Sequence, residues 1–294
     1  MKKWLTIIIV AVFMLSLAAC SQKNDSSSDT KKEVVTPKVL KIGAIPDQSA
    51  ADITRSMTDV AKYLADKTGM KVEFVPSVDY AALVTAFQRG DIQLAWFGGL
   101  TGVQARSLVP GSEAIAQRPR DAEFHSVFIT QKDSGIQKLE DLKGKSFTFG
   151  SESSTSGHLM PRYYLMQAGI DANKDFDGKP NFSGSHDTTY KLVESGAFKA
   201  GALNEAVWQA AVKDGKVDTS KVKVFYTTPP FFDYNWTINN VDKATKKKVI
   251  DALLNMGSGQ KKILDLFQTD KFVKTNNENY KPIEKVAKEL KIIQ

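Results

Sequence analysis

The stretch VLKIGAIP, residues 39 to 46, begins the pattern that decides the fold. It is an apolar run closed by Pro46, which is typical of a strand, and the apolar residues after it recur at helical spacing up to Gly69. The alternation continues with a strand, a helix and a strand, predicted at 71–76, 79–89 and 91–97. Short helices between apolar strands indicate an α/β protein with a mostly parallel sheet covered on both faces.

The same alternation resumes after Ser126. We expect further strands at 126–130, 146–149 and 200–203, and helices at 136–145, directly after Ser156 and at 188–195. A strand that runs into two prolines at 229–230 ends this second unit, and the helices after it are predicted at 243–256, 261–267 and 282–290. Two α/β units predict two lobes, which we place at 37–125 with 231–294, and at 126–230.

The first twenty residues have the pattern of a signal peptide. Lys2 and Lys3 precede an apolar run at 4–17 and the small residues before Cys20. Cys20, the only cysteine, lies where a bacterial lipoprotein signal places the residue that is lipidated after cleavage. The alternatives are an ordinary secretory signal or a membrane helix, but the run is short against the span of about 20 residues that a membrane helix needs. Once Cys20 is lipidated, no cysteine is left for a disulfide, a zinc site or a thiol nucleophile.

The segment 21–36 is polar and without periodicity, so we expect a flexible tether. The formal net charge of +7 is spread thinly along the chain. Since no basic cluster with interleaved aromatic residues is present, nucleic acid is not an expected partner.

The sequence FGSESSTSGHLMPRYYL, 149–165, places a run of hydroxyl residues between a predicted strand and a predicted helix. A helix N-terminus binds anions through its free N–H groups, and Ser154, Thr155 and Ser156 would add hydroxyl donors to it. A single N-cap residue would need only one of them, and that alternative stays open. The run is not a G-x-S-x-G elbow, which weakens the case for a serine nucleophile.

Other polar and aromatic candidates follow predicted strands. The three histidines are His125, His158 and His186. Their spacing is not that of metal ligands, so neither a metal nor a cofactor is expected. His186 is of interest because it opens a predicted helix in SGSHDTT, 183–189. Phe97 ends the third predicted strand, where core packing is the simpler role, and Asp233 lies among aromatic residues. A carboxylate at an anion site would demand a protonated ligand.

Four stretches together resemble the phosphate, phosphite and phosphonate substrate-binding proteins of ABC importers, especially the branch labelled selenate or phosphonate transporters. They are VPSVDYAALVTAFQRGDIQLAWFGG at 75–99, SGIQKLEDLKGKSFTFGSESSTSGHLMPRYYL at 134–165, SGSHDTT at 183–189 and TTPPFFDYNW at 227–236. The resemblance covers the chain after the predicted signal. It implies a type II periplasmic-binding-protein fold, two lobes that close on a ligand in the cleft between them, and no catalysis.

The resemblance also implies roles for individual residues. It implies that Tyr80 donates to the ligand from the first lobe and that Ser154, Thr155 and Ser156 form an oxyanion cradle. It also implies that His186 completes this cradle and that Asp233 is the acid near the point where the chain returns to the first lobe. Phe97 stands where phosphonate binders commonly carry a tyrosine, so one donor is missing. Asn204 stands near the position where aminoalkyl-phosphonate binders place an acid that binds the ligand amine. The absence of an acid at Asn204 favours a small oxyanion without an amine.

We therefore expect a monomeric, lipid-anchored receptor on the extracytoplasmic face of the cell membrane. It would capture a phosphite, phosphonate or phosphate and deliver it to a permease and its ATPase. The alternatives are a selenate or sulfate receptor, an oxyanion-sensing subunit of a signalling kinase, and an envelope serine hydrolase.

Overall fold

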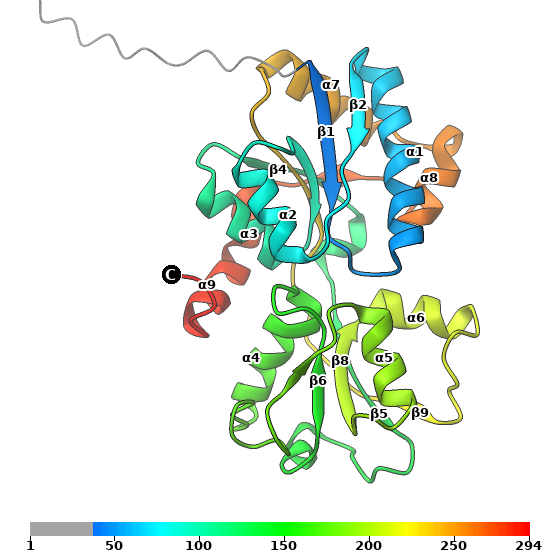
Figure 1. The fold of residues 1–294 in the computed structure, drawn as a ribbon, viewed down its shortest axis with the longest axis vertical. Coiled ribbons are helices and arrows are strands. Elements are labelled where there is room, and N and C mark those ends of the chain that lie inside the picture. Colours follow the sequence, from blue (N-terminus) through cyan, green and yellow to red (C-terminus); the bar gives the residue numbers. More distant parts are fainter. Residues whose placement is uncertain (1–37) are drawn as a thin grey trace, which may run out of the picture. The chain divides into compact units, whose positions relative to one another are not determined.

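The computed structural model describes residues 38–294. The predicted signal peptide 1–20, with Cys20, and the predicted tether 21–36 lie outside the described residues. The described chain has two β-sheets, one above the other in Figure 1. We call each sheet with its helices a lobe.

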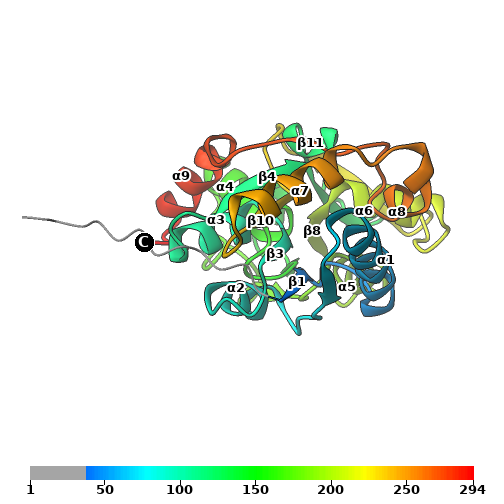
Figure 2. The ribbon, with the colours of Figure 1, turned by 90° about the horizontal axis from the view of Figure 1, so that it is seen from above.

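Lobe 1 is built on a six-stranded sheet in the order β11-β4-β10-β3-β1-β2. Its strands are β1 (Val39–Ala44), β2 (Lys71–Phe74), β3 (Leu94–Phe97), β4 (Glu113–Gln117), β10 (Asn235–Ile238) and β11 (Val273–Lys274). Its helices are α1 (Ala50–Thr68), α2 (Tyr80–Gln88), α3 (Gly99–Leu108), α7 (Lys243–Leu254), α8 (Lys261–Leu266) and α9 (Lys281–Glu289). Seen from above, α1 and α3 lie on opposite sides of the central strands (Figure 2). Helices thus cover both faces of this sheet.

Lobe 2 is built on a five-stranded sheet in the order β7-β6-β8-β5-β9. Its strands are β5 (Ser126–Gln131), β6 (Phe147–Phe149), β7 (Asn181–Phe182), β8 (Ala200–Asn204) and β9 (Val222–Thr227). Its helices are α4 (Met160–Gln167), α5 (His186–Glu194) and α6 (Glu205–Lys213). Alternation along β5 explains the layers, because Phe128 packs with α4 while Val127 and Ile129 pack with α5 and α6.

The prediction of mostly parallel sheets is wrong. β1 pairs in parallel with β2 and β3, but β10 lies antiparallel between β3 and β4. In lobe 2, β6 is parallel to β7 and β8, whereas β5 is antiparallel to β8 and β9. β11 is also antiparallel to β4, and of the reversed strands β5 and β10 directly follow a passage of the chain from one lobe to the other.

The predicted helix at 136–145 is also wrong, since only a short 3-10 helix forms at Leu139–Leu142. Asp141 uses its carboxylate to accept the N–H groups of Gln137 and Lys138, which fixes a turn at the start of the segment. Gly144 has a positive φ of 70°, which ends it. The apolar spacing there reflects two leucines that anchor a loop on the core.

The two passages between the lobes lie side by side. Phe124 and Phe231 exchange backbone hydrogen bonds of 2.8 and 2.9 Å and form an isolated antiparallel bridge. Tyr234, just beyond this bridge, has its ring 5.5 Å from that of Phe124 and stacks on Trp96. The bridge therefore joins the connecting segments to the aromatic core of lobe 1.

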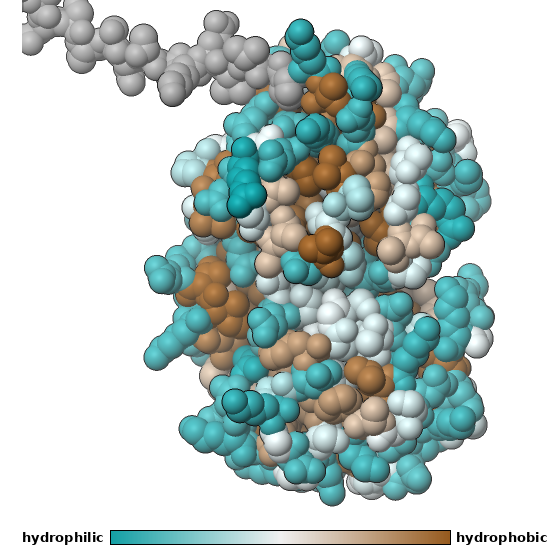
Figure 3. All heavy atoms as spheres, in the orientation of Figure 1, coloured by the Kyte–Doolittle hydropathy of each residue, from teal (hydrophilic) through white to brown (hydrophobic). Residues whose placement is uncertain are grey.

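No helix within residues 38–294 is both long and apolar enough to cross a bilayer. The face in Figure 3 is mainly hydrophilic, with apolar side chains in separate small groups.

Candidate functional site

Several helices begin where the two lobes meet. α2 begins at Tyr80, α3 at Gly99, a helical turn that leads into α4 at Thr155, and α5 at His186. The Leu100 N–H, in the first turn of α3, donates to Thr155 Oγ1 across the lobes at 2.9 Å. The first N–H groups of a helix have no partner within it and carry partial positive charge. Their meeting here makes this place attractive to an anion.

Three residues at or next to these helix starts carry a buried polar side-chain atom that has no hydrogen-bond partner in the described chain. The atoms are Tyr80 Oη, His186 Nε2 and Asp233 Oδ2. Each of the three residues is at most 2% exposed. An unpaired buried polar atom costs free energy, so native structures satisfy nearly all of them. A ligand that hydrogen-bonds to all three would remove that cost.

The residues Ser154, Thr155 and Ser156 of the hydroxyl run make different contacts. Ser154 is the N-cap, because its Oγ accepts the Gly157 N–H at 2.9 Å. The capping interpretation is therefore right for one residue of the run and leaves Thr155 and Ser156 for other contacts. Their hydroxyls lie near the Asp233 carboxyl, whose pKa they lower against the larger effect of burial.

Gly157 is required by close packing under the run. The Gly150 N–H donates to Gly157 O at 2.8 Å, which draws the end of β6 against the helical turn. A Cβ at Gly157 would lie 3.1 Å from both Gly150 Cα and His186 Cε1. The glycine thus lets the hydroxyl run and His186 approach the same point.

The histidines differ in how fully they are paired. His158 has both ring nitrogens in hydrogen bonds, with Glu152 O and with the Arg162 guanidinium. His186 accepts the Asn204 N–H on Nδ1 at 3.4 Å, and burial lowers the pKa of its imidazole to about 4. Near neutral pH His186 is therefore uncharged, with its proton on Nε2, where it can donate to an anion.

Asp233 and Tyr80 complete the site from lobe 1. Asp233 Oδ1 accepts the Gly99 N–H at 2.8 Å, and burial raises the pKa of the carboxyl to about 7. The pKa of Tyr80 is raised well above its ordinary value by burial and by the nearby carboxyls of Asp47 and Asp233. Near neutral pH the Tyr80 hydroxyl keeps its proton, and Asp233 can either accept or donate one.

Phe97 is a core residue in the structure. It is fully buried, and its ring meets the edge of Phe87 at a centroid distance of 5.4 Å. A hydroxyl donor at this position is missing, as expected, but the next two residues, Gly98 and Gly99, bring backbone close to Asp233 and Thr155.

Sequence reasoning missed Asp47 and Tyr234, and it considered Asn204 only as the mark of a missing partner for a ligand amine. Asp47 follows β1, Tyr234 precedes β10, and the Asn204 side chain ends β8, all at the same meeting place. Burial raises the pKa of the Asp47 carboxyl to about 6. The rule that sites lie beyond the carboxyl ends of strands could have found Asp47 and Asn204. The role of Tyr234 depends on tertiary contacts that no local pattern shows.

Arg118 lies close by, over the ring of Tyr234, but it is buried in an ion pair with Asp121 at 2.6 Å. Within residues 38–294 no group of acidic, histidine or cysteine side chains could hold a metal ion. The polar groups that this place could offer to an anion are therefore hydroxyls and a neutral imidazole.

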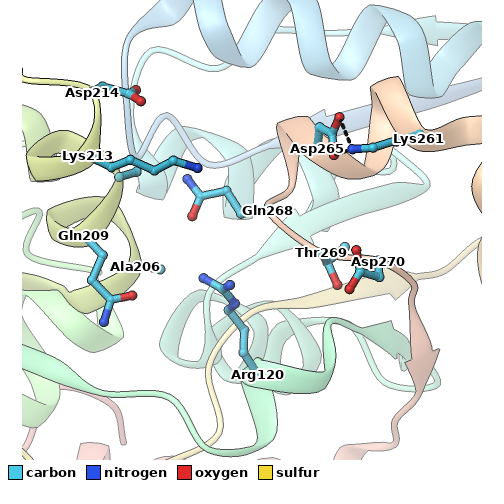
Figure 4. A pocket seen from close by; sticks show the side chains of 11 residues that line it. Arg120, Ala206, Gln209, Lys213, Asp214, Lys261, Asp265, Gln268, Thr269 and Asp270 are labelled. Atoms are coloured by element: carbon cyan, nitrogen blue, oxygen red, sulfur yellow. Dashed lines mark hydrogen bonds and ion pairs between the residues drawn. The ribbon is translucent and has the colours of Figure 1, made fainter.

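A separate hollow of about 730 Å³ lies against α6 and α8. Figure 4 shows Lys213 and Gln268 extending toward one another across it, with Arg120 below. Its ion pair, Lys261 with Asp265, is exposed. None of the unpartnered buried atoms of the described chain lines this hollow. The better candidate for the functional site is the place where α2, α3, α5 and the turn before α4 begin.

The family model for the ABC transporter phosphonate periplasmic substrate-binding protein matches residues 42–280. The chain belongs to this family, and it is an extracytoplasmic substrate-binding component that works with an ABC permease and ATPase. The predictions of the family and of the type II periplasmic-binding-protein fold are confirmed.

Individual relatives support this assignment. The probable ABC transporter phosphite binding protein PhnD1 of Prochlorococcus marinus is 44% identical over 273 residues, 88% of this chain and 92% of that protein. The phosphonates-binding periplasmic protein of Escherichia coli is 27% identical over 75% of this chain and 67% of its own length. The solved structure of Prochlorococcus marinus PhnD1 with methylphosphonate has 42% identity and a TM-score of 0.84, and the match covers 88% of this chain and all of that one.

Proposed function

We propose that the protein captures a small phosphorus oxyanion, such as phosphite or methylphosphonate, between its two lobes. The observation that carries the proposal is the set of three unpartnered buried atoms, Tyr80 Oη, His186 Nε2 and Asp233 Oδ2, beside helix N-termini. Two of these groups donate a hydrogen and the third can accept one. A tetrahedral anion with one P–OH group matches that combination, with Thr155 and Ser156 as further contacts.

The carboxyl of Asp233 is the proposed selector among oxyanions. Sulfate and selenate offer only acceptors, so above the pKa of about 7 an ionised Asp233 would repel them and stay unpaired, whereas a ligand with a P–OH group brings the missing hydrogen itself. A buried mismatch of one hydrogen is costly, which is why polar sites reject analogues that lack it. This argument favours phosphite and phosphonate over the selenate named in the resembling branch.

The lobes are proposed to move as units joined at the two passages of the chain. We place the boundaries at 125/126 and 230/231, so that lobe 1 comprises 37–125 and 231–294 and lobe 2 comprises 126–230. The backbone bridge between Phe124 and Phe231 lies beside both boundaries and would act as the hinge. Cross-lobe hydrogen bonds such as that from Leu100 to Thr155 would form on closure.

The receptor role is proposed to involve no catalysis, a monomeric protein and a lipid anchor at Cys20. Ser154, one serine of the hydroxyl run, is a helix cap whose Oγ accepts a backbone N–H. No hydrogen bond joins a histidine ring to a hydroxyl of the run among the described residues, as a serine nucleophile would need.

The test is a calorimetric panel of phosphite, methylphosphonate, phosphate, sulfate and selenate with the purified protein. We expect phosphite or methylphosphonate to bind most tightly, and at 100 times its dissociation constant to stabilise the fold by about 2.7 kcal/mol. Asp233→Asn should narrow the gap between phosphite and selenate. Tighter binding of selenate than of phosphite by the unmutated protein would overturn the assignment.

A further inference from the structure

Four buried residues form a closed ring of hydrogen bonds between the lobes. The Tyr234 hydroxyl donates to Asp47 Oδ2 at 2.7 Å, and it accepts from Asn204 Nδ2 at 2.9 Å. The backbone N–H of Asn204 donates to His186 Nδ1 at 3.4 Å, and the backbone N–H of His186 donates to the carbonyl oxygen of Asp47 at 3.1 Å. Asp47 and Tyr234 belong to lobe 1, whereas His186 and Asn204 belong to lobe 2. The ring is complete only when the lobes are together.

The members of the ring are held in place from outside it. Trp96 stacks on the Tyr234 ring at 5.5 Å, and the Arg118 guanidinium lies 4.7 Å from the centroid of the same ring. Asn204 Oδ1 accepts the Val207 N–H at 3.1 Å as the N-cap of α6. That bond fixes the orientation of the amide, so that Nδ2 is the atom that faces Tyr234.

The ring decides which nitrogen of His186 carries the proton. Nδ1 must be bare to accept the Asn204 N–H, so the hydrogen of the neutral imidazole lies on Nε2. Nε2 is the atom that has no partner within the described chain and is directed at the candidate site. The ring therefore presents a donor at the position where an oxyanion would sit.

We propose that Asp47, Tyr234 and Asn204 are positioning residues that fix the tautomer of His186 and link its presentation to closure of the lobes. The inference rests on the proposed function for the identity of the ligand. The positioning itself is a property of the ligand-free protein. Tyr234 is the central member, because its hydroxyl both donates and accepts and so joins the two lobes.

The test compares Tyr234→Phe with Tyr63→Phe as a matched control. Tyr63 is also a buried tyrosine of lobe 1, and its hydroxyl donates to Ala252 O at 2.8 Å within that lobe. The readouts are the ¹⁵N chemical shifts of the His186 ring and the affinity for methylphosphonate. Since the chain has 3 histidines, His125→Gln and His158→Gln variants assign the signals.

We expect wild type and Tyr63→Phe to show the Nε2–H tautomer of His186. In Tyr234→Phe we expect a mixture of tautomers and an affinity about tenfold lower or weaker still, as for the loss of one hydrogen bond. Asn204→Asp is the second variant, because it keeps an oxygen to cap α6 but cannot donate to Tyr234 Oη. It should show the same two changes.

The outcomes separate the two proposals. A wild-type protein that binds no member of the oxyanion panel refutes the proposed function, and the ring nitrogen shifts then still decide the positioning role. If Tyr234→Phe and Asn204→Asp fold and keep the wild-type tautomer of His186, the proposed positioning role of the ring is wrong. Equal loss of affinity in Tyr63→Phe would likewise show a general effect of losing a buried hydroxyl and overturn it.

Discussion

At the residue scale, Asp233 raises the question of how a buried carboxyl and a bound anion can share one site. Burial raises the pKa of Asp233 to about 7, although the Gly99 N–H and the nearby hydroxyls of Thr155 and Ser156 lower it. The carboxyl therefore gains or loses its proton in the range where phosphorus oxyanions also do. One proton held between Asp233 Oδ2 and a ligand oxygen would turn repulsion into a hydrogen bond, whichever partner brings it.

This sharing predicts proton uptake at alkaline pH. At pH 8.5 free Asp233 and free methylphosphonate are both largely deprotonated, so forming the complex should take up about one proton and affinity should fall about tenfold per pH unit. Calorimetry in buffers of different ionisation enthalpy measures the uptake. In Asp233→Asn the amide supplies its own hydrogen, and we expect no uptake. A binding heat of the wild type that does not depend on the buffer would contradict the shared proton.

Ser156 gives the clearest test of the hydroxyl run. Ser156→Ala should weaken methylphosphonate binding by roughly 1.5–3 kcal/mol, the value of a hydrogen bond to a charged group, with little change in melting temperature. Ser153→Ala is the matched control in the same run, because Ser153 precedes the cap and is not fully buried. If Ser156→Ala binds as tightly as Ser153→Ala, the hydroxyl has no part in binding.

The sequence pointed to the hydroxyl run, His186 and Asp233 because they follow predicted strands, whereas Tyr80 came only from the family resemblance. Tyr80, Ser156, His186 and Asp233 come from separate stretches, and the structure brings them to one place, while their contact with a ligand stays a prediction. Tyr234 could not be chosen in the same way. Its importance comes from contacts with Asp47 and Asn204, far away along the chain.

At the element scale, the turn that joins β6 to α4 is the most sensitive part of the site. Gly157→Ala would place a Cβ 3.0 Å from Ser154 Oγ and 3.1 Å from Gly150 Cα and from His186 Cε1. We expect a loss of about 1–3 kcal/mol in stability from this overpacking, and weaker binding as Ser156 and His186 shift. Thermal unfolding and calorimetry measure the two effects.

Gly259→Ala is the control for this change. A Cβ there meets no atom within 4 Å, so both stability and affinity should stay close to wild type. Wild-type affinity in Gly157→Ala would show that the turn tolerates a side chain and that its close packing does not serve the site.

Elements with strong local signals were predictable, and those defined by burial were not. α1 has an amphipathic face, the N-cap Ser49 and a left-handed Gly69 at its end, and its spacing predicted it. α3 was missed because nearly all of its first half is buried, so no polar face marks its period. β10 was missed because its four residues are all buried and follow a proline-rich passage without alternation.

At the scale of the whole molecule, closure of the lobes would bring the candidate ligand groups of both lobes together. The backbone bridge of Phe124 and Phe231 holds the passages together, while the ligand groups are divided between lobes, with Asp233 in one and His186 in the other. Neither lobe alone offers a complete set of partners to an oxyanion. Binding is therefore expected to favour the closed arrangement by the amount that the second lobe adds to affinity.

The proposed lipid anchor is at Cys20, which lies outside the described residues. If Cys20 carries the lipid, Cys20→Ser should prevent acylation and normal signal processing, because a serine has no thiol for the lipid. Metabolic labelling with a radioactive fatty acid measures this change. A Cys20→Ser protein that takes up as much label as wild type would refute the anchor.

Binding supplies the control for this last prediction. The proposed tether separates Cys20 from lobe 1, and Tyr80, His186 and Asp233 all lie in the lobes. Affinity of the purified Cys20→Ser protein for methylphosphonate should therefore equal that of the wild type. Because the variant lacks the lipid that would confine the wild type to the membrane surface, we expect uptake of the oxyanion to fall without any loss of affinity. Unchanged uptake by cells that make the unacylated variant would show that delivery to the permease does not need the lipid.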